Sequence, residues 1–106
     1  MRDAWSSKQP AGTSPRLMYR KRAWQAQAKL LLLLRSVPCT DCTETYPPYC
    51  MDFDHRDPSQ KRHSVMAMVS RTGTAAILTE VAKCDVVCAN CHRMRTYRRR
   101  HAAERE

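Results

Sequence analysis

The chain has 106 residues and a formal net charge of +9, from 19 Lys and Arg against 10 Asp and Glu. This length allows one domain and not two, with a small core for which an additional cross-link is expected. A balance this basic favours a polyanionic partner, most commonly nucleic acid; a basic protein without such a role is the alternative.

The sequence contains no recognisable secretory or membrane-spanning segment. Residues 1–10 have no apolar stretch, and the one apolar run consists of the five leucines over residues 30–34. A bilayer-spanning helix needs roughly 20 apolar residues. We therefore expect a cytoplasmic protein that does not enter membranes. In that reducing compartment, Cys pairs bind metals more often than they form disulfides.

Residues 1–14 are expected to form a flexible tail, because Gly, Pro, Ser and Thr are frequent there. A basic amphipathic helix is expected over residues 15–37, opened by a Ser-Pro pair that suits a helix N-terminus. One apolar stripe along this helix is predicted from the seven-residue spacing of Leu17, Trp24 and Leu31. The basic face of the helix is either simply solvated or contacts the DNA backbone.

The main domain is expected over residues 38–101, followed by a short tail over residues 102–106. Alternating polarity predicts a strand over residues 49–55, with Asp52 and Asp54 on the face opposite the apolar side chains. The other predicted elements are a helix over 74–82, a strand over 85–88, an Arg-rich helix over 91–101, and a segment over 65–70 that fits a helix or a strand.

Two Cys-x-x-Cys pairs stand out, Cys39 with Cys42 and Cys88 with Cys91. Each pair places two thiolates on a tight turn, and two pairs complete the tetrahedral four-thiolate shell of structural Zn²⁺. The alternatives are buried thiols or redox pairs, but a thioredoxin-like motif needs a βαβ context, which is missing here.

The 45 residues between Cys42 and Cys88 exceed the about 15–20 of an ordinary zinc ribbon. A functional insert therefore fits between the two pairs, and the metal would bring its ends together. Cys50 and Cys84 lie inside this insert. They are expected to be small buried apolar residues, with replacement of one zinc ligand as the alternative.

Within the insert and at its edge, residues 52–57 read DFDHRD and residues 88–96 read CANCHRMRT. An Asp-His pair at a strand end, followed by a CxxC-His turn that opens a helix, resembles the HNH endonucleases of the ββα-metal (His-Me finger) type. The resemblance covers roughly residues 39–98 and is to small phage and bacterial members with a structural zinc. It implies a small α+β chain with the ββα-metal (HNH) fold, stapled by two zinc knuckles and preceded by a basic helix.

The resemblance also implies a chemistry. Phosphodiester hydrolysis needs an activated water and a cation that takes up charge on the phosphate. By resemblance, His55 is the general base, while Asp54 and His92 bind one catalytic ion, Mg²⁺ or Mn²⁺, with Ni²⁺ also accepted. Phage DNA processing or packaging beside terminase subunits, in the host cytoplasm, is the corresponding expectation for the pathway.

Several positions leave questions open. Lys83 stands where many HNH proteins have the middle Asn, and Asn90 lies inside the second Cys pair, where it suits a turn. What orients His55 is therefore undecided, with a backbone carbonyl as one candidate. Thr96 stands where some relatives have a further His, so only two protein ligands are expected for the catalytic ion.

Adjacent residues on a regular strand face opposite sides, so Asp54 and His55 can share one site only where the strand ends or bulges. The loop that begins at Arg56 favours such an end.

Basic side chains are expected to contact DNA phosphates without regard to base sequence and in a salt-sensitive way. The predicted contacts are Arg56, Lys61, Arg93, Arg95, Arg98 and Arg99. For the basic C-terminus, a charged tail without contacts is the alternative. Two other functions remain open: a non-catalytic zinc-stapled nucleic-acid-binding module, and a zinc-stapled protein-interaction subunit.

Overall fold

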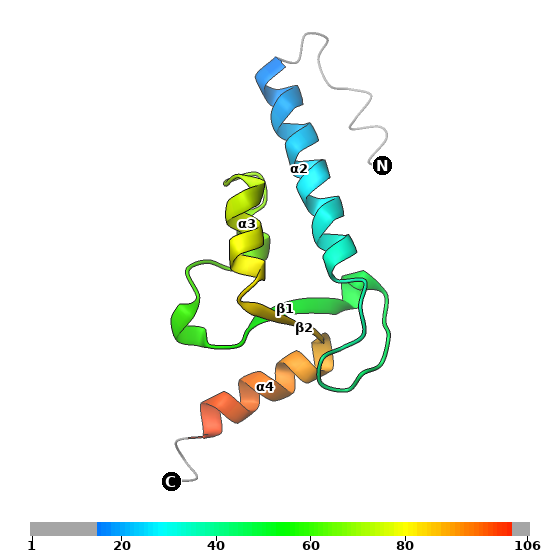
Figure 1. The fold of residues 1–106 in the computed structure, drawn as a ribbon, viewed down its shortest axis with the longest axis vertical. Coiled ribbons are helices and arrows are strands. Elements are labelled where there is room, and N and C mark those ends of the chain that lie inside the picture. Colours follow the sequence, from blue (N-terminus) through cyan, green and yellow to red (C-terminus); the bar gives the residue numbers. More distant parts are fainter. Residues whose placement is uncertain (1–14, 103–106) are drawn as a thin grey trace, which may run out of the picture.

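The computed structural model describes residues 15–102 (Figure 1). It is a small α+β arrangement, in which a two-stranded antiparallel sheet lies between α2 and α3 on one side and α4 on the other. The predicted tail over 1–14, and residues 103–106 of the second tail, lie outside the described residues. Within the described part, no helix is long and apolar enough to cross a membrane.

Helix α2 spans Pro15–Leu34, so the helix predicted over residues 15–37 ends slightly early. The apolar stripe predicted along this helix does not form a continuous buried face. Leu17 and Trp24 are 54% and 51% exposed, whereas Leu31 is fully buried. The reason is that the N-terminal half of α2 projects beyond α3, and only its C-terminal half lies close to the sheet (Figure 1).

A buried amide fastens α2 to the turn that precedes α3. Gln27 is 7% exposed. Its Nε2 donates to the Thr72 carbonyl at 3.0 Å, and its Oε1 accepts from the Ser70 N–H at 2.7 Å. Ser70 has a φ of 63°, in the left-handed region, and the bond from its N–H to Gln27 stabilises the turn in this conformation.

We expect Gln27→Leu to lower the free energy of unfolding by ~1–3 kcal/mol, because a backbone N–H and a carbonyl lose their partner. Urea unfolding of the zinc-loaded protein measures the change. The matched control is Gln25→Leu, since Gln25 lies exposed on the same helix. Equal stability of the two variants would contradict the anchoring role.

Strand β1, Met51–His55, pairs with β2, Cys84–Cys88. The register is regular, from Met51 opposite Cys88 to His55 opposite Cys84. The first strand begins two residues later than predicted, because Pro48–Cys50 form a 3₁₀ turn.

Helices α3, Thr74–Val81, and α4, Ala89–His101, lie within two residues of the predicted bounds. The segment over 65–70 is neither a regular helix nor a strand, since it forms a 3₁₀ turn over Val65–Met68. One apolar cluster joins α2, this turn and α3, and it consists of Leu31, Val65, Met68, Val69 and Ile77. A second cluster surrounds Met51 and Val87 and includes three of the paired cysteines.

Candidate functional site

The two Cys pairs form one cluster, in which the Sγ atoms of Cys39, Cys42, Cys88 and Cys91 all lie within 4.8 Å of one another. In tetrahedral zinc sites with Zn–S bonds of about 2.3 Å, the sulfurs lie about 3.8 Å apart. The cluster could therefore hold a structural ion such as Zn²⁺. The sequence prediction that the four cysteines come together is confirmed, in an arrangement that could hold one metal ion.

The thiols of this cluster influence one another strongly. Although burial acts to raise it, backbone N–H donors at Cys42 and Cys88 lower the pKa of Cys39 to about 6. Burial and the neighbouring thiols raise the pKa of Cys91 to about 12. The Cys39 thiol therefore ionises readily, whereas ionisation of the Cys91 thiol is opposed. A bound divalent cation would stabilise both thiolates.

The residue that follows the first Cys pair has an unfavourable backbone conformation. Thr43 has a φ of 65°, which is unfavourable for a β-branched side chain. Its N–H donates to the Cys39 carbonyl at 2.9 Å, so the turn around the thiols requires this conformation.

We expect Thr43→Gly to raise the stability of the zinc-loaded protein by ~1 kcal/mol, because glycine adopts positive φ without steric cost. Thermal unfolding measures the change. Thr45→Gly is the control, since Thr45 is exposed and does not have a positive φ. If Thr43→Gly were as destabilising as Thr45→Gly, the strain argument would be wrong.

The second Cys pair connects β2 to α4. The Cys88 N–H donates to Cys39 Sγ at 3.3 Å, and the Cys91 N–H donates to Cys88 Sγ at 3.4 Å. These contacts fix the N-terminus of α4 beside the thiol cluster. His92, the next residue, is thereby held against β1.

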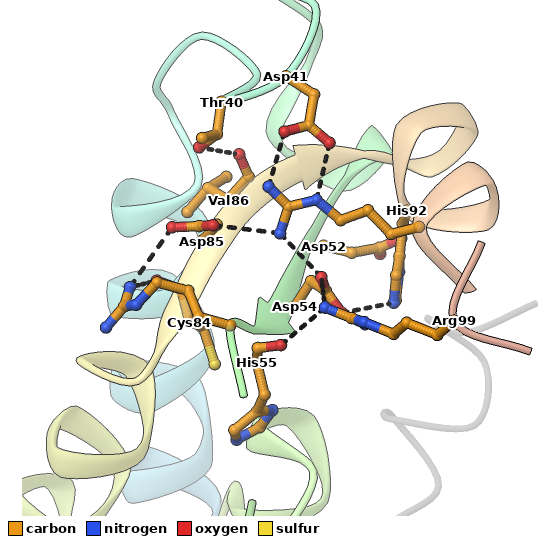
Figure 2. A network of polar contacts seen from close by, with 12 residues as sticks. Thr40, Asp41, Asp52, Asp54, His55, Cys84, Asp85, Val86, His92 and Arg99 are labelled. Atoms are coloured by element: carbon orange, nitrogen blue, oxygen red, sulfur yellow. Dashed lines mark hydrogen bonds and ion pairs between the residues drawn. The ribbon is translucent and has the colours of Figure 1, made fainter. Parts of the chain in front are cut away.

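His92 lies between two carboxylates of β1 (Figure 2). Its Nδ1 is 3.0 Å from Asp52 Oδ2, and its Nε2 is 3.4 Å from Asp54 Oδ1. Neighbouring ligand atoms of an octahedral Mg²⁺ lie about 3.0 Å apart. The Asp54 oxygen and the His92 nitrogen therefore approach the spacing of two ligands of one ion.

Asp52 is a residue to which the sequence reasoning assigned no role. Its contact with His92 Nδ1 matches the carboxylate that commonly orients a metal-binding His. The alternation of polar and apolar residues along β1, which places Asp52 on the same face as Asp54, is the sequence signal from which this role could have been inferred.

Asp54 is already neutralised by two guanidinium groups. Its side chain is 5% exposed, and it accepts bonds of 2.9 Å from Arg95 and of 2.8 and 2.9 Å from Arg99. Although burial acts to raise it, the hydrogen bonds from Arg99 and Arg95 hold the pKa of Asp54 below its ordinary value. A divalent ion at Asp54 would compete with both arginines.

Arg95 also bridges Asp41 and Asp85, at 2.6 and 3.1 Å. These carboxylates, Asp41 foremost, raise its pKa although burial opposes them. Several predicted DNA contacts thus have partners within the chain, namely Arg56, Arg95 and Arg99. The others, Lys61, Arg93 and Arg98, are exposed.

His55 faces the other side of β1. The strand ends directly after His55, as expected, but it pairs regularly up to that residue. Figure 2 shows the ring pointing away from Asp54 and from His92. The structure brings Asp54 and His92 together, and the strand end does not bring the His55 side chain onto their face.

The partner of His55 is Glu80 of α3, whose Oε2 lies 2.7 Å from His55 Nε2. Both residues are buried, at 6% and 3% exposure. Sequence reasoning assigned Glu80 no role. The available signal was that Glu80 is the one acidic residue in an otherwise mostly apolar helix.

An open hollow of about 550 Å³ lies along α4 beside His92. Asp52 of β1 forms part of its wall, and the other lining residues come from α4: Ala89, His92, Arg93, Thr96, Tyr97, Arg100 and His101. Two of these residues, Arg93 and Arg100, are exposed arginines, so the hollow suits an anion.

Comparisons of the chain with protein-family models, with curated proteins and with solved structures found no match.

Proposed function

We propose that the chain is a metal-dependent DNA endonuclease of the HNH type. The observation that carries the proposal is the approach of His92 Nε2 to Asp54 Oδ1 at 3.4 Å, next to the four-Cys cluster. A carboxylate oxygen and an imidazole nitrogen this close to one another support the proposal that they share one divalent ion. The net charge of +9 supports a polyanionic substrate.

Asp54 and His92 would hold one Mg²⁺ or Mn²⁺, and a bound ion of this kind neutralises charge on the scissile phosphate. Asp52 orients the His92 ring through Nδ1. Arg93 and Arg100, which line the hollow beside His92, would contact the neighbouring phosphates. His55 would accept the proton of the attacking water, which requires its ring to approach the phosphate across the end of β1.

The test is a plasmid-nicking assay with Mg²⁺, Mn²⁺ or Ni²⁺. We expect His55→Ala to lower nicking at least ~100-fold, the usual contribution of a general base. His63→Ala is the matched control, because His63 is an exposed loop histidine, and it should nick like the wild type. Equal activity of His55→Ala and wild type would remove His55 as the base.

A second candidate function is a zinc-stapled nucleic-acid-binding module without catalysis. The observation that favours it is the double engagement of Asp54 by Arg95 and Arg99, together with the burial of His55. Salt-sensitive binding to duplex DNA, without nicking under any of the three metals, would select this function.

A further inference from the structure

We infer that Glu80 is a positioning residue for His55: its carboxylate holds the imidazole in the tautomer with the proton on Nε2, which leaves Nδ1 as the basic nitrogen. The role as a base rests on the proposed nuclease function. The tautomer does not, because it follows from the contacts of two buried side chains.

The first step is the contact itself. The distance between His55 Nε2 and Glu80 Oε2 is 2.7 Å, and the two side chains are 7% and 4% exposed. Charge-assisted hydrogen bonds of this length, removed from water, are stronger than neutral ones. They also hold a ring in one orientation, as the carboxylate partner of a catalytic His does.

The second step is the charge of Glu80. Its Oε2 also accepts the Arg62 N–H at 3.0 Å, and its Oε1 accepts Lys83 Nζ at 3.0 Å. The Arg62 N–H above all, helped by His55 and Lys83 and opposed by burial, lowers the pKa of Glu80 to about 2. An ionised carboxylate only accepts hydrogen bonds, so the ring nitrogen that faces it carries the proton.

The third step is the free nitrogen. No described residue is hydrogen-bonded to His55 Nδ1. Yet the described part of the chain contains no fully buried side-chain nitrogen or oxygen without a partner. Nδ1 is therefore not fully buried, so the unprotonated nitrogen keeps some accessible surface toward solvent.

Lys83, which stands where many HNH proteins have their middle Asn, acts on Glu80 and not on His55. Its Nζ donates to Glu80 Oε1 at 3.0 Å and to the Gln60 carbonyl at 3.1 Å. The question of what orients His55 thus has a specific answer, a carboxylate from α3 that Lys83 and Arg62 fix in turn.

The experiment is ¹⁵N NMR of the histidine rings in the zinc-loaded full chain, at mildly alkaline pH, where an ordinary imidazole is neutral. Ring nitrogens with and without a proton have distinct shifts. We expect wild-type His55 to be protonated on Nε2 alone. Protonation on Nδ1, or an even mixture, would overturn the inference whether or not the chain cuts DNA.

The matched variants are Glu80→Gln and Lys83→Met. We expect Glu80→Gln to mix the two tautomers and to lower kcat at least ~10-fold at unchanged KM, a partial loss of the general-base contribution. Lys83→Met keeps the His55 contact and should retain the wild-type tautomer. An unchanged tautomer in Glu80→Gln would refute the inference; if that variant does not fold, the wild-type spectrum decides alone.

Loss of the Nε2-H preference in Glu80→Gln without any nicking by wild type would separate the two claims. The positioning contact would stand, and the proposed nuclease function would fail.

Discussion

Removal of the metal is expected to unfold the chain. Cys39→Ser, or treatment of the wild type with a strong chelator, should abolish the far-ultraviolet helical signal and the cooperative unfolding transition. Structural zinc contributes an apparent ~10–16 kcal/mol in small zinc domains, which matches or exceeds the ~5–15 kcal/mol total stability of a typical domain. The apolar clusters described above are too small to replace it.

Cys39 is the most informative ligand to change, because it is 2% exposed and its Sγ also accepts the Cys88 N–H. Cys50→Ser is the matched control, since Cys50 is partly buried and lies outside the cluster. The zinc content, measured by atomic absorption, should be one ion per chain in wild type and in the control. A folded, metal-free wild type would refute the structural role of the cluster.

The second large effect is expected for Asp54→Asn. The neutral amide cannot balance two guanidinium groups, and we expect the zinc-loaded protein to lose ~2–4 kcal/mol. This range lies below that of a fully buried pair, because the Arg99 side chain is 36% exposed. If the proposed function is right, nicking also falls at least ~100-fold at temperatures where the variant is folded.

The pKa of Asp54 is lowered in the folded chain, so its stabilising charge is fully present above the ordinary carboxyl pKa of about 4. It is lost only as the pH falls below that value. Urea unfolding at neutral pH therefore reports the whole effect. Glu44→Gln, which removes one exposed negative charge, is the control. Equal stability of the two variants would show that α4 does not depend on Asp54.

Much of the local structure could be predicted from the sequence, because it depends on short-range patterns. Alternating polarity by itself indicates the strand that ends at His55. The Cys-x-x-Cys spacing by itself indicates the turn that opens α4. The environment of α2 could not be predicted in this way. Leu17 and Trp24 have helical spacing, but spacing does not reveal where the neighbouring chain stops covering a helix.

For the candidate site, the sequence predicted that Asp54 and His92 lie together, but it predicted neither their partners nor the side of β1 that the His55 ring faces. Asp54 and His92 meet, as the motif implied. The arginines that neutralise Asp54, and the carboxylate that holds His55, come from other turns and other helices. Such contacts depend on how the helices pack across the sheet, which no short sequence pattern records.

The regular ladder between β1 and β2 has a consequence for misfolding. Side chains alternate along β1, so a slip of the strands by one residue would turn the Asp54 carboxylate toward α3 and the His55 ring toward α4. Both strands are only five residues long, and hydrogen bonds alone would select weakly between neighbouring registers. Met51 pairs with Cys88, so one thiol of the four-Cys cluster lies at the end of the ladder. Closure of the four-Cys cluster therefore favours the one register that brings Cys88 to the other thiols. This register determines which side chains lie on each face of the sheet.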